Sequence, residues 1–379
     1  MNRRRCLIAV AALVLFGSAR PAAAAKTLSI GQMEQLLGRL QGKPDGKAAS
    51  ELKDVQLTER VSHARLARWE TEFPGAHTHV QLVKLSDMSA FLDPPAADVV
   101  RDPRPDVKTQ LQIIKLAVEY VANTIPRLPD FYATRITTHF ENDPSQPISS
   151  AGGAGVMFRP AGAFTRIVTY RDGKEVPYEN VGRLKQESPL VLTTSGEFGP
   201  VLSVVVGDAL DGKVKWLRWE QGAGGRAAVF SYAVPQADSH FVVGVAVRSK
   251  SQGVLSAYHG EIAIDPETGA VLRLSQIADM AAPHDAMRAE IAVDYGPVTI
   301  SGRRYICPIR GVAFSQFPVP TRYASTGLDG VQVTGAEDQS SWPIKTELND
   351  VAFTNYHEFG SEARIVTAPA QTQTQSPPQ

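Results

Sequence analysis

The chain carries the stretch Tyr258-His259-Gly260-Glu261-Ile262-Ala263-Ile264-Asp265, followed by Thr268-Gly269-Ala270-Val271-Leu272-Arg273-Leu274. Large apolar side chains alternate with other residues up to Asp265, which indicates a strand with one buried face. Asp265 to Gly269 has the residue types of a tight turn, and Val271 to Leu274 returns from it. This stretch predicts an antiparallel hairpin, and the pattern decides the fold because it recurs along residues 128–366.

Alternating segments of the same kind appear from residue 128 onwards. Asp172-Gly173 joins two of them and is a strong signal for a two-residue hairpin turn. Successive strands joined by short turns, each with one apolar and one polar face, predict a large antiparallel sheet. The expected strands include the runs 132–140, 164–170, 230–234, 241–247, 258–264, 287–295 and 351–355.

Residues 26–127 have the apolar spacing of helices instead. Ser29 with Gln32 has the form of a capping box ahead of a stripe at Ile30, Met33, Leu37 and Leu40. The clearest helix starts near Val107 and stops at Pro126, with one expected stripe at Val107, Leu111, Ile114, Val118, Val121 and Ile125. We therefore expect an α+β chain, with a helical domain at 26–127 and a β domain at 128–366.

One stretch, Val201 to Leu210, interrupts the series of strands. Its valines favour a strand, whereas Pro200 just before it suits the first turn of a short helix. A helix packed against a sheet would be apolar nearly all round, as this stretch is. We favour the helix and expect it to cover the sheet.

The two ends of the sequence differ from its middle. Arg3, Arg4 and Arg5 precede an apolar run that ends at Phe16, and Ala22 to Ala25 follow it. Charge, a short apolar run and small residues in that order predict a signal peptide at 1–25, and hence a periplasmic or extracellular protein. Residues 367–379 use only Thr, Ala, Pro, Gln and Ser, and they predict a disordered tail.

Composition and motifs exclude several functions. Lys plus Arg and Asp plus Glu both total 39, so the chain lacks the basic surplus of a nucleic-acid binder. No later segment reaches the length of a membrane span, and we expect none after cleavage. Hydrolase, nucleotide and zinc motifs are missing, so no catalytic residue, metal or cofactor is predicted. Cys307, in an apolar run, is expected to be a buried and inert thiol.

The most concentrated aromatic segment is Trp216-Leu217-Arg218-Trp219. Strand alternation predicts Trp216 and Arg218 on one face and Leu217 and Trp219 on the other. The aromatic rings either pack in the core or form a wall of an apolar pocket. On the second interpretation, the candidate ligand-binding residues are Trp216, Trp219, Val201, Leu202, Val205, Phe230, Tyr232 and Tyr258.

The hairpin at 258–274 resembles one in bacterial outer-membrane lipoprotein-sorting and carrier proteins. Phe230 to Pro235 and Asp294 to Pro308 fit the same series, and the resemblance covers at most Leu128 to Ile365. It implies a strongly curved, incompletely closed antiparallel sheet with a helix over its concave face and a cavity for acyl chains. Leu128 to Arg135 and Leu348 to Phe353 also resemble uncharacterised exported bacterial proteins, which supply no activity.

Three functions follow as hypotheses. The first is a non-enzymatic binding module for an apolar ligand or a lipidated partner at the cell envelope. The second is an extracytoplasmic hydrolase, which would require convergent titratable groups; His139, His240, His259 and His357 far apart would argue against it. The third is envelope scaffolding, which would require an exposed apolar patch on the helical half.

Overall fold

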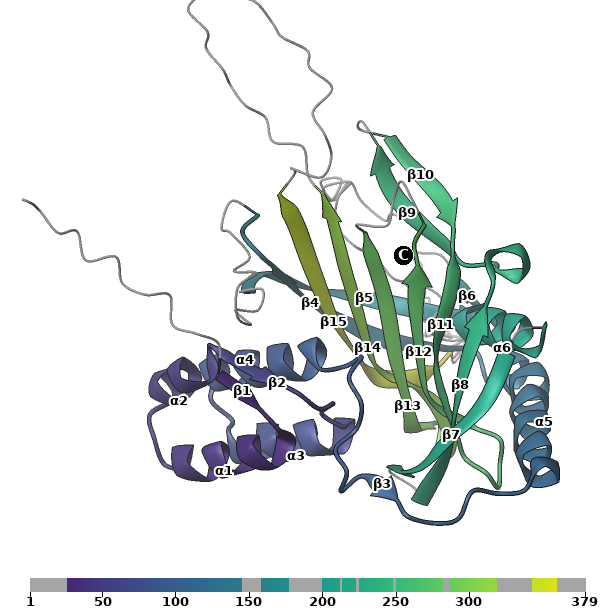
Figure 1. Cartoon of the computed structure of the whole chain (residues 1–379), viewed down its shortest axis with the longest axis horizontal. Helices are drawn as coiled ribbons and strands as arrows, with labels where there is room; N and C mark the ends of the chain where they lie inside the picture. Colours follow the sequence, from purple (N-terminus) through teal and green to yellow (C-terminus); the bar gives the residue numbers. More distant parts are fainter. Residues whose placement is uncertain are drawn as a thin grey trace, which may run out of the picture.

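The computed structural model describes residues 26–144, 158–176, 200–211, 213–222, 225–247, 250–281, 287–318 and 343–359. In these ranges the chain is α+β, as predicted, with a helical unit followed by a large antiparallel sheet (Figure 1). The expected signal peptide at 1–25 and the expected disordered tail at 367–379 lie outside the described residues.

The helical unit has its own hydrophobic core, in which Met33, Leu52 and Leu82 are fully buried. The predicted capping box is confirmed: Gln32 N donates to Ser29 Oγ at 3.3 Å, and Ser29 N donates to Gln32 Oε1 at 2.9 Å. The elements of this unit are β1 (Lys26–Leu28), α1 (Ile30–Leu40), α2 (Asp45–Leu52), β2 (Val55–Leu57), α3 (His63–Glu72) and α4 (Ala76–Met88).

The large sheet has the strand order β3-β7-β8-β11-β12-β13-β14-β15-β4-β5-β6, and a separate hairpin pairs β9 with β10. Its strands are β3 (Val99–Val100), β4 (Phe131–Glu141), β5 (Arg159–Arg171), β6 (Lys174–Val176), β7 (Lys213–Gly222), β8 (Gly225–Val234), β11 (Ala257–Ile264), β12 (Val271–Asp279), β13 (Arg288–Ile300), β14 (Arg303–Pro318) and β15 (Ile344–Glu358). The separate hairpin consists of β9 (Val242–Val247) and β10 (Lys250–Leu255).

Two predicted turns are confirmed. Asp172 and Gly173 have φ angles of 52° and 73° and join β5 to β6, which is the backbone that an Asp-Gly hairpin turn requires. Asp265 Oδ1 accepts hydrogen bonds from Glu267 N at 2.9 Å and Thr268 N at 3.1 Å between β11 and β12. These local turns fix the antiparallel pairing of the strands on either side.

The sheet bends around two helices, α5 (Val107–Asn123) and α6 (Pro200–Asp211) (Figure 1). One hydrophobic cluster joins both helices to strands from opposite ends of the sheet, including Tyr170 of β5 and Trp219 of β7. The face that packs on α5 and α6 is therefore the inner face of a curved sheet, and the other is its outer face. The sheet is not closed into a barrel, because β3 and β6 remain at its two ends.

Helix α5 is rotated relative to the expected stripe. Val107 and Leu111 are 67% and 61% exposed, whereas Gln110, Ile113 and Ala117 are buried. The apolar positions of α5 cover two overlapping faces, and contact with the sheet and α6 selects the one that begins at Gln110. The helix thus packs in the cluster of the sheet, although it precedes the expected domain boundary at residue 128.

The outer face of the sheet packs on α4 of the helical unit. Val83 and Ala90 share a small apolar cluster with Phe140, Val312 and Leu348 of three neighbouring strands. Beside this cluster, the structure buries charged side chains instead of apolar ones. The junction of the two parts of the chain is therefore both an apolar and an ionic contact.

Arg310 of β14 is the centre of this junction. Its guanidinium donates to Asp87 of α4, to Ser86 Oγ at 2.8 Å and to Asp350 of β15 at 2.8 Å. Asp87 is completely buried, and burial together with the nearby charge of Asp350 raises its pKa well above the usual carboxyl range, although Arg310 opposes this. One guanidinium thus serves two carboxyl groups, and burial raises the pKa of Asp87 in spite of it.

Further ion pairs surround this centre on the same face. Arg60, from the loop before α3, pairs with Glu220 of β7. Arg218 pairs with Glu220 at 3.0 Å and with Glu261 of β11 at 2.7 Å. Arg273 of β12 donates to the carbonyl oxygen of Ala90. Removing one partner of such a pair would leave a buried charge uncompensated, which costs about 3–5 kcal/mol, so the junction fixes how the two parts meet.

Replacing Asp87 with asparagine should change how stability depends on pH. A carboxyl group with a raised pKa stabilises the fold fully below the unfolded pKa of about 3.9, and this stability is lost as the pH rises through the folded pKa. The asparagine side chain has nearly the same size and does not titrate. We expect the unfolding free energy of wild type minus that of Asp87→Asn to fall as pH rises above the carboxyl range, measured by urea denaturation.

The control is Thr165→Val, at an exposed position of β5, which removes no titrating group, so the difference from wild type should not depend on pH. A constant difference between wild type and Asp87→Asn from pH 4 to pH 9 would contradict a raised pKa of Asp87.

Candidate functional site

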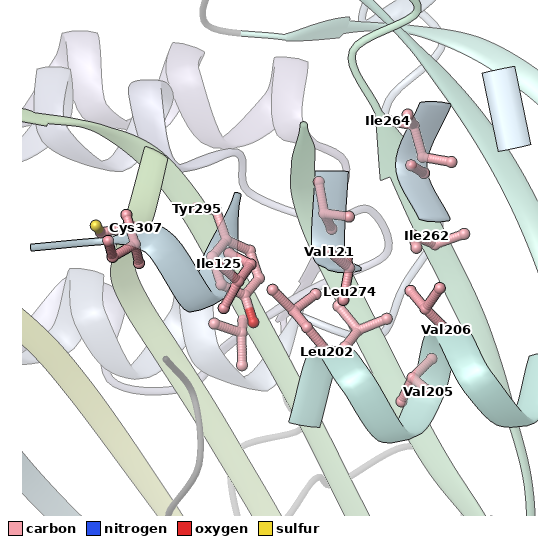
Figure 2. Close-up of a cluster of buried hydrophobic side chains, with 14 of the residues drawn as sticks. Val121, Ile125, Leu202, Val205, Val206, Ile262, Ile264, Leu274, Tyr295 and Cys307 are labelled. Atoms are coloured by element: carbon pink, nitrogen blue, oxygen red, sulfur yellow. The ribbon is translucent and has the colours of Figure 1, made fainter. Parts of the chain in front are cut away.

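The inner face brings together all eight residues that the sequence singled out as ligand-binding. Six are in the cluster and at most 5% exposed, and Val201 and Trp216 pack against it half-buried. Figure 2 shows Leu202, Val205 and Val206 of α6 beside Ile262 and Leu274 of the sheet. The predicted helix at 201–210 is confirmed as α6, and it covers the sheet. Contact of these eight residues with a ligand stays a prediction.

A cavity remains between α5, α6 and the sheet. Its volume is about 30 Å³, and every residue that lines it is apolar. The lining consists of Ile114, Ala117, Val118, Val206, Ala209, Val214, Phe230, Ile262 and Ile264. Only Phe230 of these was predicted as a ligand-binding residue. Period-two alternation already placed Ile262 and Ile264 on one face, whereas the α5 residues were assigned to a different domain.

The aromatic segment of β7 does not alternate as expected. The pairing register of β7 with β8 shifts between Trp216 and Arg218, which is a β-bulge. The bulge brings Trp216 and Trp219 to the same side, with ring centroids 4.8 Å apart, and leaves Leu217 42% exposed. The prediction that opposite faces separate Trp216 from Trp219 is therefore wrong. Both rings pack in the inner cluster, as the core interpretation predicted, and neither lines the cavity.

A buried carboxylate fastens α6 to the sheet. Asp208 of α6 is 5% exposed and accepts from His240 N at 2.9 Å, from Tyr258 Oη at 2.8 Å and from His240 Nδ1, 2.7 Å away. Burial, and then the hydrogen bond to Asp208, raise the pKa of Tyr258, so its hydroxyl stays protonated and donates. Asp208, His240 and Tyr258 form what we call the α6 latch.

The neighbouring tyrosine, Tyr232, is held by a different bond. Its hydroxyl donates to Ser275 O at 2.6 Å, over the backbone of Gly260. A Cβ at Gly260 would lie 1.9 Å from that oxygen, so only glycine fits there. Burial raises the pKa of Tyr232 well above its usual value. The polar atoms of both tyrosines are thus occupied, and their rings present an apolar surface to the inner cluster.

The four histidines singled out by the sequence do not converge within the described residues. His139 contacts Asn349, His240 contacts Asp208, and His259 contacts Asp279. His139 on β4 and His259 on β11 are five strands apart, which is about 24 Å along the sheet. His357 lies against the ring of Tyr132. Among the described residues, no two of these four histidines share a partner, so no observation favours a hydrolase.

The helical half exposes few large apolar residues. Within 26–127 these are Leu92, Val107 and Leu111, and the last two lie one turn apart on α5. Such a pair is smaller than the apolar patches of several hundred Å² that mark interaction sites. The described residues therefore give no reason to prefer the scaffolding hypothesis. They also contain no helix that combines the length and the apolarity needed to cross a membrane.

The thiol of Cys307 is not a nucleophile. Cys307 is 1% exposed, and burial raises the pKa of its thiol to about 12, so it is an inert core residue, as predicted. Comparison of the chain with family models, with curated proteins and with solved structures found no match in any of the three. A function for this chain is therefore inferred from the inner face itself.

Weakening the α6 latch should loosen α6. In Asp208→Asn the carboxylate becomes a neutral amide with a single acceptor oxygen, so the hydrogen bonds from His240 and Tyr258 lose their charged acceptor. A hydrogen bond to a charged group contributes about 1.5–3 kcal/mol, so the amides of α6 should exchange with solvent at least about tenfold faster. Hydrogen exchange read by mass spectrometry measures this.

Asp238→Asn, at an exposed position in the 3-10 helix η2 (Gln236–Asp238), is the matched control and should leave α6 unchanged. Equal exchange of α6 in wild type and Asp208→Asn would show that the latch does not hold this helix.

Proposed function

We propose that this protein is a non-enzymatic binding module whose curved sheet holds an apolar ligand, either an acyl chain or a lipidated partner, at the cell envelope. The observation that carries the proposal is the inner face: a purely apolar cavity beneath a short helix that packs by apolar contact on α5 and the sheet. Polar groups near it, on Asp208, Tyr232 and Tyr258, are already paired.

The ligand would occupy the space that α6 now fills. A cavity of about 30 Å³ is about the volume of one water molecule, whereas ligand pockets usually measure about 300–1,000 Å³. Leu202, Val205 and Val206 take up the adjoining space. An acyl chain therefore enters only when α6 shifts outward, and the same helix closes the empty sheet.

The free energy lost when α6 leaves the sheet and the free energy gained when an acyl chain replaces it are of similar size. Removing Leu202, Val205 and Val206 from the core would cost about 1.5–3 kcal/mol for each, or about 5–9 kcal/mol together. Each buried methylene of a ligand contributes about 0.8 kcal/mol, so a chain of about twelve carbons offsets the loss. A chain of fewer than about six carbons would not offset even the lower figure. Long acyl chains are therefore favoured over short ones.

The proposed location rests on the sequence. The basic residues Arg3 to Arg5, the apolar run that follows and Ala22 to Ala25 support export, and a lipid or lipid-bearing protein is a ligand that an envelope compartment contains. Neither a nucleic acid nor a cofactor enters this proposal.

Charge on the inner side of α6 should open the site. Val205 is 1% exposed, and an unpaired carboxylate there costs several kcal/mol, so Val205→Asp should lower the melting temperature and release α6 from the sheet. In wild type we expect an uncharged apolar fluorophore, N-phenyl-1-naphthylamine, to bind and dodecanoate to displace it. In Val205→Asp this displaceable binding should be tighter, because α6 no longer competes with the ligand for the inner face.

The matched control is Ser203→Asp, which places the same charge on the exposed side of the same helix and should change neither melting nor binding. Val206→Trp is a second variant, because it fills the cavity without adding charge and should block the fluorophore in a folded protein. Absence of fluorophore binding to wild type, with no lipid in solvent extracts of the purified protein, would contradict the proposed function.

A further inference from the structure

The inner face changes character along each of its central strands. On β15, Phe353 and Val351 lie in the apolar cluster, and Asn349, two residues further, is polar and 2% exposed. The change occurs at the same level on β4, where Thr137 pairs with Val351 and His139 with Asn349. An apolar zone on α5 and α6 is therefore continuous with a buried polar zone on the same face.

The polar zone contains two hydroxyl groups without partners. Thr137 is 2% exposed and Ser315 is 8% exposed, and within the described part of the chain neither hydroxyl makes a hydrogen bond. A buried polar group that lacks a partner costs about 1–3 kcal/mol. Folding alone gives no reason for either hydroxyl, since valine and alanine would fill the same space without this cost.

The register of the strands places these groups in one line. Thr137 is diagonal to Asn349 across β4 and β15, and Asn349 is diagonal to Ser315 across β15 and β14. Each diagonal step is about 7–8 Å. His139 Nδ1 lies 2.6 Å from Asn349 Oδ1, an acceptor, so Nδ1 donates this hydrogen bond. We call Thr137, His139, Asn349 and Ser315 the polar stripe.

We propose that the polar stripe is a subsite for the uncharged, hydroxyl-bearing head of an amphiphile whose acyl chain occupies the apolar zone. This inference rests on the proposed function and adds the chemistry of the head. The stripe supplies two hydroxyls, an imidazole and an amide, whose donors and acceptors suit the hydroxyls of a glycerol or a sugar. A charged head suits it less, because buried Glu347 would repel an anion and Arg135, whose guanidinium lies 5.9 Å from the Phe353 ring centroid, would repel a cation.

The length of the stripe distinguishes two heads. Thr137 lies at the border of the apolar zone, and Ser315 lies two diagonal steps from it, about 15 Å. The glycerol of a monoacylglycerol reaches Thr137 but not Ser315, whereas the disaccharide of an alkyl maltoside reaches further along the stripe. Ser315 should therefore matter only for the longer head.

The test uses Thr137→Val and Ser315→Ala in the full-length protein. Because each change removes an unpaired hydroxyl, each should raise the melting temperature of the ligand-free protein, by about 2–4 °C for 1 kcal/mol. Thr137→Val should lower the affinity for both monododecanoylglycerol and dodecyl maltoside about fivefold, because one hydrogen bond to each is lost. Ser315→Ala should lower only the affinity for the maltoside. Affinity for N-phenyl-1-naphthylamine, which has no such head, should not change. The affinity for each amphiphile is measured by its displacement of this fluorophore.

Thr165→Val is the control, because Thr165 is exposed on the outer face of β5 and should affect neither melting nor binding. Thr137→Val that melts at a lower temperature, or that binds both amphiphiles as wild type does, would overturn the polar stripe as a head-group site. If wild type binds the fluorophore but both variants bind the two amphiphiles as wild type does, only this inference fails. If wild type does not bind the fluorophore, the proposed function fails with it.

Discussion

The inner face of the sheet depends on α6 remaining in place. A sheet that bends around its own core needs apolar side chains on its concave side, and α6 supplies Leu202, Val205 and Val206 there. The helix has only about three turns, and beyond apolar contact it is held by the carboxylate of Asp208. Few contacts and one latch make α6 an element of lower local stability than the strands beneath it.

The outer face is fixed in a different way. Arg310 joins α4 to β14 and β15 through buried ion pairs, and neighbouring pairs join the helical unit to β7, β11 and β12. Such pairs contribute little net free energy, but they are costly to break singly, so they specify one arrangement of the two parts. In the proposed function this junction stays fixed while α6 moves, so the conformational change is confined to the inner face.

Local sequence patterns predicted most of the fold and part of the site. The Asp172-Gly173 turn, the Asp265 turn and helix α6 depend on neighbouring residues, and all three are confirmed. The start of the α5 stripe, at Val107 and Leu111, was wrong because the partners of α5, the sheet and α6, are distant in sequence, whereas Val121 and Ile125 are buried as expected. The Trp216 bulge was missed because alternation assumes an unbroken register. The polar stripe could not be predicted, since it depends on which strands pair and on their register.

The position of α6 is the variable that links folding to binding in the proposed function. Hydrogen exchange of residues 200–211, with and without dodecyl maltoside, tests this link most directly. We expect the ligand to lower the protection of α6 amides while strands β11 to β13 keep theirs, because the acyl chain replaces α6 on the sheet. Full protection of α6 in the protein with ligand bound would contradict the proposed displacement.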